Sequence, residues 1–315
     1  MMRIVVTGAH GFVGRAVCSA LVANGEDVVR AVRSSHNSTD IVVGNISSST
    51  YWAPVLTGAN VVIHLAARVH MMRDMATDPL AEFLETNCAA SLHLARQAHV
   101  AGVRRFVFIS SIGVNGAATE VGGAFSEMST IHPHSPYAVS KADAERQLSQ
   151  FCNEVGMELV IIRPPLVYAY DAPGNFESLL KIVAKGVPLP LRQVRNLRSM
   201  VSLENLVDFI CLCAHAPAAA HQVFLVADTD SVSTPQLLRY LGEGMSRPVT
   251  LLPVPVSLLR IGAAVLRRQA TFQQLCGNLE IDSSKAMKML NWTPPTTISA
   301  GLREAGRRFV DEKSI

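Results

Sequence analysis

Hydrophobic residues in the first half of the chain fall into short apolar runs separated by helical patterns. The run "RIVVT" (3–7) ends just before a glycine, which predicts a buried parallel strand. In the following segment, apolar residues from Val13 to Leu21 recur at helical spacing, and Gly25 ends the predicted helix. The run "DVVRAV" (27–32) predicts a second strand. The chain therefore begins with a βαβ unit.

The same alternation continues to about residue 166. Strands are expected at 60–66, 104–111 and 158–165, and helices at 79–101 and 136–155. Asp78 and Ser135 are suitable N-caps for the two helices, and a proline follows each of them at the first helical position. Repeated βα units predict an α/β fold, with a doubly wound parallel sheet covered by helices on both faces.

The pattern changes after residue 166, where proline-rich loops such as "GVPLPL" and "LLPVPV" separate shorter elements. We expect a cofactor-binding domain at 1–166 and a smaller C-terminal substrate-binding lobe at 167–315, with segments such as 222–228 returning to the sheet. The apolar stretch 251–268 contains two internal prolines and Arg260, which argue against a membrane span. An amphipathic helix that covers a substrate pocket is favoured there over one that rests on a bilayer.

The composition narrows the class of ligand. Hydrophobic residues make up 49% of the chain and charged residues 17%, which suits a large core and excludes a disordered protein. The net charge of +3 is spread along the chain, so a small anionic ligand is favoured over nucleic acid. The six cysteines have no zinc-site spacing, which predicts free thiols, no metal site and a cytoplasmic protein.

Three glycines, Gly8, Gly11 and Gly14, lie between the first predicted strand and the first predicted helix. Glycines at such positions permit a tight turn, let the backbone approach a pyrophosphate and allow the helix to pack close to the strand. The helix N-terminus then favours the negative charge. This context predicts a Rossmann dinucleotide-binding site rather than a simple tight turn.

The second strand ends in "AVRSS" and lacks the acidic residue that usually binds the ribose 2′-hydroxyl of NAD. Arg33, with Ser34 and Ser35, offers a positive fork and two hydroxyls to a 2′-phosphate. NADP(H) is therefore favoured, and NAD(H) stays possible. The alternative reading of Arg33 is an ordinary exposed arginine at a strand end.

A candidate catalytic pair lies at the start of the helix expected at 136–155. Tyr137 and Lys141 are four residues apart and share one helix face. A free tyrosine titrates near pH 10, so a nearby cation is needed to stabilise its phenolate, and Lys141 can supply it. Ser111 ends the strand expected at 104–111 and could donate a hydrogen bond to a substrate carbonyl.

The glycine spacing and the order of Ser111, Tyr137 and Lys141 resemble the extended short-chain dehydrogenase/reductase (NAD-dependent epimerase/dehydratase) family. "SSIGVNG", "GNF" and "VPLPL" are most similar to its bacterial UDP-N-acetyl-hexose 4-ketoreductases and 4-epimerases of surface-polysaccharide pathways. The resemblance implies a homodimer through the two long helices, a UDP-sugar substrate and no stable membrane insertion.

The resemblance also implies further site residues, carried over position by position. Asn45 stands where the family usually has aspartate beside the adenine, and Ala169 stands where it usually has glycine. Besides the three glycines, Arg33, Tyr137 and Lys141, the implied cofactor contacts are Phe12, Val13, Asn45, Ile46, Leu65, Ala66, Ala67, Asn87 and Pro164. The implied substrate contacts are Ser111, Tyr137, Asn175 and Arg198, of which Asn175 and Arg198 could equally be a loop cap and a surface charge.

The leading functional expectation is NADPH-dependent reduction of the 4-keto group of a UDP-linked, N-acetylated, 6-deoxy hexose. Tyr137 would protonate the developing alkoxide, Ser111 would polarise the carbonyl, and Lys141 would lower the pKa of the tyrosine. The first alternative is an NAD-dependent UDP-hexose 4-epimerase that uses the same residues. A sterol or flavonoid ketone reductase and a non-catalytic NADP-binding regulator are further alternatives.

Overall fold

The computed structural model describes residues 1–36, 38–69 and 78–313. Within them, a seven-stranded, fully parallel sheet has the order β3-β2-β1-β4-β5-β6-β9. Its strands are β1 (Arg3–Thr7), β2 (Asp27–Val32), β3 (Asp40–Val42), β4 (Val61–His64), β5 (Arg105–Ile109), β6 (Glu158–Arg163) and β9 (Gln222–Leu225). The strand order reverses between β1 and β4, which is where a doubly wound sheet opens a crevice at its carboxyl edge. The expected Rossmann-type α/β fold is confirmed.

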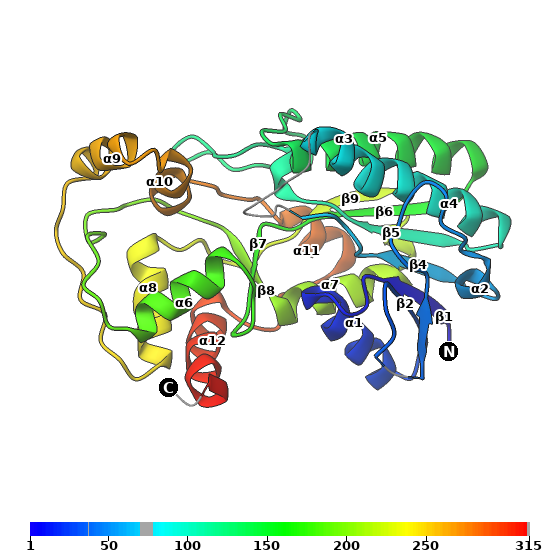
Figure 1. Cartoon of the computed structure of the whole chain (residues 1–315), viewed down its shortest axis with the longest axis horizontal. Coiled ribbons are helices and arrows are strands. Elements are labelled where there is room, and N and C mark those ends of the chain that lie inside the picture. The colour runs from blue at the N-terminus through cyan, green and yellow to red at the C-terminus, as the bar shows by residue number, and fades with distance from the viewer. Residues whose placement is uncertain (37, 70–77, 314–315) are drawn as a thin grey trace.

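Helices cover both faces of the sheet (Figure 1). One face carries α2 (Ala53–Leu56), α3 (Pro79–Leu84), α4 (Ala90–Val100) and α5 (Pro136–Val155), and the other carries α1 (Phe12–Ala23), α7 (Leu203–His215) and α11 (Ser284–Leu290). Along β1, Ile4 and Val6 belong to the core beneath α1 and α7, whereas Val5 belongs to the core beneath α4 and α5. Burial on both faces explains why the strands read as continuous apolar runs.

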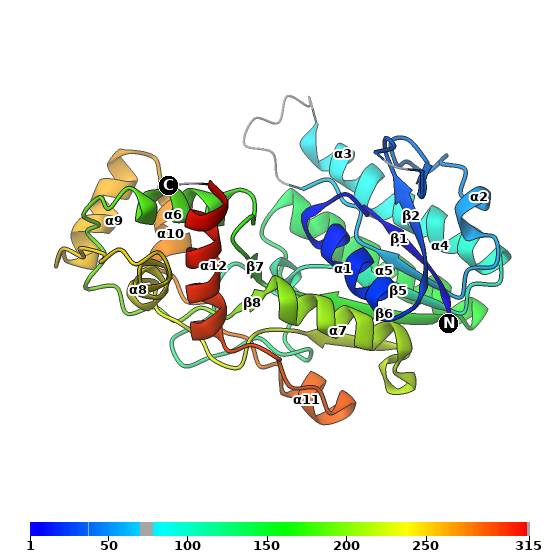
Figure 2. The ribbon, with the colours of Figure 1, turned by 90° about the horizontal axis from the view of Figure 1, so that it is seen from below.

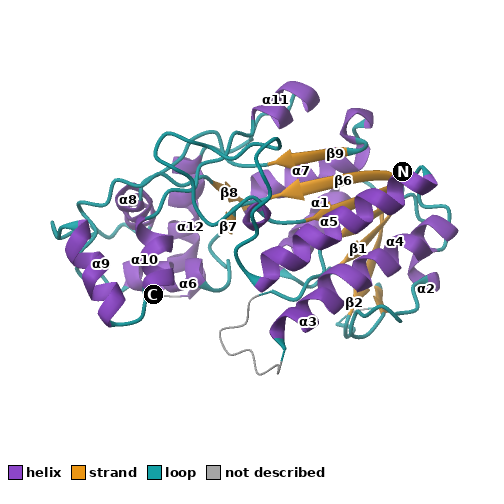
Figure 3. Cartoon of the chain, turned by 90° about the horizontal axis from the view of Figure 1, so that it is seen from above, coloured by secondary structure: helices purple, strands orange, loops and turns teal. Residues whose placement is uncertain are grey.

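The helix expected at 79–101 is interrupted by a π-helical turn, η1 (Glu85–Ala89), between α3 and α4. The turn inserts an extra residue and places Asn87 in the interior, where its amide is fully used. The helix expected at 136–155 is continuous, because Ser135 caps the amide of Ala138 and Gly156 ends the helix with φ of 70°. Figure 3 shows α3, α4 and α5 side by side over the sheet.

The second half of the chain builds a smaller lobe and also contributes β9 to the sheet. The lobe contains the parallel pair β7 (Leu166–Tyr168) and β8 (Met200–Ser202), and the helices α6 (Asn175–Ala184), α8 (Thr234–Gly244), α9 (Val256–Val265), α10 (Gln269–Cys276) and α12 (Ile298–Lys313). Figure 2 shows α12 on the side of the lobe nearest the sheet, with α8 beside it. Short 3₁₀ turns lie at η2 (Ile112–Val114) and η3 (Pro217–Ala219). None of the helices in the described residues combines the length and apolar character needed to cross a bilayer.

A buried hydrogen-bond cluster joins the lobe to the sheet. The Tyr168 hydroxyl, at the end of β7, donates to Asp228 Oδ2 at 2.7 Å. Asp228 Oδ1 accepts from Ser202 N at 3.0 Å and from Asn205 Nδ2 at 2.7 Å. Burial raises the pKa of Asp228, and these three donors oppose that shift. These hydrogen bonds hold the ends of β7 and β8 against the segment that follows β9, and each of the polar groups named has a partner.

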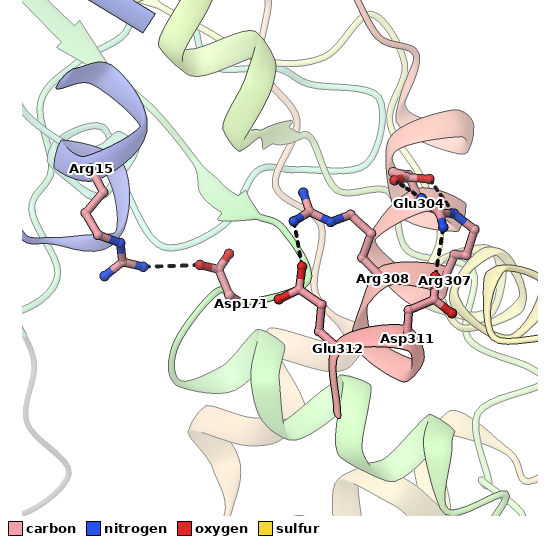
Figure 4. Close-up of polar contacts among 7 residues, drawn as sticks. All are labelled: Arg15, Asp171, Glu304, Arg307, Arg308, Asp311 and Glu312. Atoms are coloured by element: carbon pink, nitrogen blue, oxygen red, sulfur yellow. Dashed lines mark hydrogen bonds and ion pairs between the residues drawn. The ribbon is translucent and has the colours of Figure 1, made fainter. Parts of the chain in front are cut away.

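One surface ion pair adds a weaker connection between the lobe and the first helix, and further ion pairs lie within α12 (Figure 4). Arg15 of α1 pairs with Asp171 of the loop after β7 at 3.2 Å, so the first helix and the lobe meet at this point. Along α12, Arg307 pairs with Glu304 and with Asp311 at helical spacing. Exposed pairs of this kind contribute about 0.2–1 kcal/mol each, so the buried cluster around Asp228 is the stronger junction.

Candidate active site

The glycine loop between β1 and α1 forms a cradle that side chains could not occupy. Gly8 has φ of 67°, and Gly11 N donates to Gly8 O at 2.8 Å. A Cβ on Gly14 would lie 2.1 Å from Gly8 O, and one on Gly8 would lie 2.9 Å from Ala66 N. The backbone is thus bare at the N-terminus of α1, which is the arrangement that receives a pyrophosphate. The cradle fits a dinucleotide.

Other expected cofactor positions lie around this cradle. Leu65, Ala66 and Ala67 follow β4 directly, and Ala66 N donates to Thr7 Oγ1 at 3.2 Å. Pro164 follows β6, and its carbonyl accepts from Ile112 N at 2.9 Å. At the start of α1, Val13 packs on the core beneath the sheet and Phe12 packs on the core of the lobe. These segments come from the carboxyl ends of β1, β4 and β6, as the sequence predicts.

Basic groups gather beyond the end of β2. Arg33 is exposed, and the rings of His10 and His36 lie 4.5 Å apart. A cavity of about 500 Å³ beside α1 is lined by these two histidines and by Arg15 and Arg30. Asn45 is exposed and Ile46 is partly buried after β3.

Asp40, at the start of β3, is an acidic neighbour that the sequence analysis missed. Its Oδ2 lies 3.0 Å from His10 Nε2 and accepts from His36 N at 2.8 Å. The carboxylate is covered and already hydrogen-bonded. The strand that carries Asp40 has only three residues, and none of them is fully buried, so the hydrophobic pattern of the sequence did not predict this strand.

Ser111 and the first turn of α5 converge at the carboxyl end of β5. Ser111 Oγ accepts from Gly113 N at 3.1 Å, which caps η2. A Cβ on Gly113 would be within 3.5 Å of Ser111 Oγ, His134 Cε1 and Ala138 Cβ. The structure therefore brings Ser111 beside the turn that carries Tyr137. His134, which the sequence analysis did not single out, borders the same point.

Tyr137 and Lys141 have different surroundings on that helix face. The Tyr137 ring lies edge-on to Phe83, and burial raises the pKa of Tyr137 to about 12. Lys141 is buried, and its Nζ donates to the carbonyl of Ile109 at 2.8 Å. Burial lowers the pKa of Lys141 to about 7, with Glu145 opposing the shift. Within the described residues, Lys141 is therefore directed at the end of β5 and not hydrogen-bonded to the Tyr137 hydroxyl.

A buried histidine connects the glycine loop to the helix layer. His64 Nδ1 lies 2.7 Å from Thr7 Oγ1, and His64 Nε2 lies 2.8 Å from Ser91 Oγ. Ser91 donates its own proton to Asn87 O, so His64 Nε2 must be the donor to Ser91 and Nδ1 the acceptor. Burial, aided by the charge of Lys141, lowers the pKa of His64 to about 3. The ring is neutral and its tautomer is fixed by its partners.

Asn87 extends this chain of hydrogen bonds to the candidate catalytic tyrosine. Its Oδ1 accepts from Arg68 N at 2.8 Å, and its Nδ2 donates to Arg68 O and Ser140 Oγ at 3.0 Å each. Ser140 Oγ donates in turn to the carbonyl of Tyr137 at 2.8 Å. Asn87 thus holds the segment after β4 against the first turn of α5.

A buried ion pair lies one turn beyond Lys141. Arg163 Nε, at the end of β6, donates to Glu145 Oε1 at 2.9 Å, and Arg163 Nη1 donates to Asn115 Oδ1 at 3.0 Å. Both charged side chains are buried, so removal of either partner would leave an uncompensated charge. The sequence analysis missed this pair, although the spacing of Tyr137, Lys141 and Glu145 along one helix face was a signal that it could have used.

Asn175 and Arg198, the two expected substrate residues in the lobe, both contact the segment at the end of α10. Asn175 begins α6, and its Nδ2 donates to Gln274 Oε1 at 3.1 Å. Arg198 is partly buried, which lowers its pKa, and its Nη1 donates to the carbonyl of Gly277 at 3.2 Å. In the described part of the chain, neither residue is hydrogen-bonded to Ser111, Tyr137 or Lys141. The two groups of site residues are built by different parts of the molecule.

Comparisons with known proteins show which family the chain resembles. Residues 4–227 match the sequence model of the NAD dependent epimerase/dehydratase family. The chain is 39% identical over 312 residues to a UDP-glucose 4-epimerase of Vibrio cholerae, covering 98% of this chain and 95% of that protein. It is 25% identical over 330 residues to the N-acetyl-alpha-D-glucosaminyl-diphospho-ditrans,octacis-undecaprenol 4-epimerase of Escherichia coli O157:H7, covering 99% and 96%.

Solved structures share the fold across the whole chain. A UDP-N-acetylglucosamine 4-epimerase from Bacillus cereus superposes with a TM-score of 0.79 at 17% identity, covering 98% of this chain and 99% of that one. A UDP-glucose 4-epimerase from Thermotoga maritima superposes with a TM-score of 0.78 at 21% identity, covering all of both chains. With the family match over residues 4–227, these findings identify the chain as an NAD(P)-dependent enzyme of the NAD dependent epimerase/dehydratase family.

Proposed function

We propose that this protein is a 4-epimerase of a nucleotide-linked hexose. The observation that carries the proposal is the identity of 39% with a UDP-glucose 4-epimerase across 98% of the chain. The candidate substrates are UDP-glucose and its N-acetylated counterpart. Epimerisation at C4 is an oxidation followed by a reduction at the same carbon, so no net cofactor is consumed.

The cofactor-binding role falls to residues around the glycine cradle. Gly8, Gly11 and Gly14 would hold the pyrophosphate, Asn45 and Ile46 would border the adenine, and the segment Leu65–Ala67 with Pro164 would border the nicotinamide. When bound, the nicotinamide supplies the acceptor and donor of the C4 hydride. The chain itself must then manage a single proton, that of the O4 hydroxyl.

Tyr137 is the group that we assign to this proton. It would accept the O4 proton during oxidation and return it to O4 during reduction, while Ser111 donates a hydrogen bond to O4 in both directions. Burial keeps the Tyr137 phenol neutral and weakly acidic, so it needs a nearby positive charge to reach the phenolate form that accepts the O4 proton. Lys141, on the same helix face, is the nearest cation that the helix offers.

The lobe would hold the nucleotide and diphosphate. Arg198 uses one of its five donors on Gly277 O among the described residues, so its planar fork can bind phosphate oxygens as well. Asn175 lies beside the same segment and would contact the nucleotide sugar. Substrate would then bridge the lobe and the Ser111–Tyr137 region.

Dehydration is a poorer fit to this site. Removal of water from C5 and C6 needs a second acid and base in addition to the group at O4. The segment that follows β5, residues 110–116, contains two serines, an asparagine and apolar residues, and no carboxylate. The site therefore favours chemistry confined to C4.

A second candidate function is the NADPH-dependent reduction of a 4-keto sugar. The observation that favours it is the basic group at the end of β2, where Arg33 is exposed and Asp40 is engaged with His10 and His36. This arrangement suits a 2′-phosphate better than a 2′-hydroxyl. The two candidates use the same residues and differ in whether NADPH is consumed.

The test is incubation of the purified protein with UDP-glucose and with UDP-N-acetylglucosamine, with products resolved by chromatography and NADH or NADPH followed by absorbance. We expect the C4 epimer with no net change in nicotinamide absorbance. Tyr137→Phe should lower turnover by about a thousandfold while cofactor binding is kept, and Tyr51→Phe, at an exposed position, should have no effect. If the protein forms no epimer and instead oxidises NADPH stoichiometrically with a UDP-4-keto sugar, the result would favour the reductase and contradict the epimerase.

A further inference from the structure

The helices α9 and α10 form a hairpin with an exposed apolar stripe. Neither helix contains a buried residue, and both lie wholly within the described residues. Leu258, Ile261 and Val265 recur at helical spacing and are 57%, 60% and 76% exposed. Val256 and Leu259, on the opposite side of α9, pack on the lobe core. The stripe of Leu258, Ile261 and Val265 therefore faces away from the lobe.

The charge of the hairpin has one sign. Arg260, Arg267 and Arg268 lie on or beside α9, and the sequence between Glu243 and Glu280 contains no acidic residue. None of the three arginines forms an ion pair with any residue that the structure describes. The guanidinium of Arg260 lies 5.7 Å from the ring centre of Phe272, which keeps it against α10. The hairpin combines apolar side chains with uncompensated positive charge.

The hairpin lies at the outer end of the lobe, at the opposite end of the molecule from α2 and α4 (Figures 1 and 3). It also borders the expected substrate residues, because Gln274 accepts from Asn175 and Gly277 accepts from Arg198. The hairpin and the residue that follows it therefore contact two of the residues that we expect to bind substrate.

We propose that the α9–α10 hairpin docks the enzyme on the surface of an anionic lipid bilayer. An amphipathic helix with an apolar stripe and flanking arginines lies in the interface plane, with its apolar side chains among the acyl chains and its cations at the headgroups. With ten residues, α9 is too short to cross the hydrocarbon core, so docking is peripheral.

The orientation of α9 favours contact with a bilayer over a role as a cover for the enzyme's substrate pocket. A helix that covered a pocket would turn its apolar residues inward, and Val256 and Leu259 already do so. The stripe of Leu258, Ile261 and Val265 is a second apolar face on the other side of α9, and it is exposed rather than turned toward the lobe. The absence of any acid from residues 244–279 matches the charge of anionic headgroups.

Vesicle binding tests the proposal. The full chain is sedimented with vesicles of phosphatidylcholine alone and with vesicles that also contain phosphatidylglycerol, at low and high salt. We expect binding only to the anionic vesicles, weakened by salt. Arg267→Gln with Arg268→Gln should lower the partition coefficient about 25-fold, because each cation near such a surface contributes roughly fivefold. The matched pair Arg96→Gln with Arg104→Gln removes two exposed arginines from the other end of the molecule and should have little effect.

Three results would overturn the proposal. The first is no binding to either type of vesicle, and the second is an equal loss of binding in the two arginine pairs, which would show attraction by net charge alone. The third comes from replacing Leu258, Ile261 and Val265 with serine: a smaller oligomer with unchanged vesicle binding would assign the stripe to a second copy of the chain. Turnover of a soluble UDP-sugar should be unchanged in the arginine variants, so failure here leaves the proposed epimerase untouched.

Discussion

The glycine loop after β1 and the helix α9 differ in how closely they are packed. A Cβ on Gly14 would lie 2.1 Å from the carbonyl oxygen of Gly8, whereas a Cβ on Gly262, in α9, would meet no atom within 4 Å outside its own helix. A Cβ on Gly8 would likewise lie within 3.1 Å of backbone atoms of Leu65 and Ala66. The side chains of Asn175 and Arg198 contact α10 and the residue that follows it, while the backbone of Arg198 pairs with that of Val232. The loop that we expect to receive the cofactor is therefore tightly packed, and α9 lies open on the surface of the lobe.

The largest expected effect on stability comes from a substitution in the glycine loop between β1 and α1. Gly14→Ala forces a methyl group into the Gly8 carbonyl, and we expect a loss of about 3 kcal/mol in the free energy of unfolding, at the upper end for overpacking. The same shift of the loop should abolish NAD(P) binding. Urea denaturation and cofactor titration measure the two effects. A variant with normal stability and normal cofactor affinity would show that the cradle is not as tight as its contacts indicate.

Lys141 gives the next effect, through pH. Burial lowers its pKa from 10.5 to about 7, so between these values the unfolded chain holds one proton more than the folded chain. The contribution of Lys141 to the free energy of unfolding therefore rises as the pH rises from 7. Relative to Lys141→Met, the wild type should gain about 2 kcal/mol between about pH 7 and about pH 9. Lys185→Met, at an exposed position, should show no such dependence in urea denaturation.

The fold was largely predictable because its strands are buried on both faces. Continuous apolar runs located β1, β2, β4, β5 and β6 within two residues at each end. The pattern did not reveal β3, which has three partly buried residues, or the π turn at Glu85–Ala89. The π turn is stabilised by contacts of Asn87 with residues far away in sequence, which a local pattern does not contain.

The site was predictable to the level of its order along the chain. Strand ends and helix starts predicted that Ser111 and the first turn of α5 would meet, and the contacts around Gly113 show that they do. The partner of Lys141, the Ile109 carbonyl, was not predictable, because it depends on how α5 packs on β5. The Glu145–Arg163 pair joins residues of two elements and depends on the same packing.

In the lobe, replacement of Arg198 tests whether this residue binds the diphosphate of the substrate. Arg198→Lys keeps the charge and loses the planar fork, and we expect the KM for the UDP-sugar to rise about tenfold, or about 1.4 kcal/mol, with kcat little changed. Affinity for NAD(P) should be unaffected. Arg195→Lys, at an exposed neighbouring position, is the matched control. An equal rise in KM for both variants would remove the special role of Arg198.

The smallest expected effect on stability comes from the same substitution, glycine to alanine, at the open position Gly262. Gly262 lies within α9 with open space at its Cα, so Gly262→Ala should stabilise the protein by about 0.5–1 kcal/mol through helix propensity alone. Thermal unfolding followed by circular dichroism measures the change. Destabilisation would show that the hairpin is packed more closely than its exposure indicates. It would also weaken the contrast in packing between the glycine loop and α9.

The central claim is that one hydride leaves C4 of a nucleotide sugar and returns to the same carbon. UDP-glucose deuterated at C4, incubated with the enzyme and analysed by mass spectrometry and proton NMR, tests it directly. The account predicts UDP-galactose that retains the deuterium at C4, formed without net oxidation or reduction of the nicotinamide. Loss of the deuterium from the epimer, or the absence of any epimer from both UDP-glucose and UDP-N-acetylglucosamine, would contradict it.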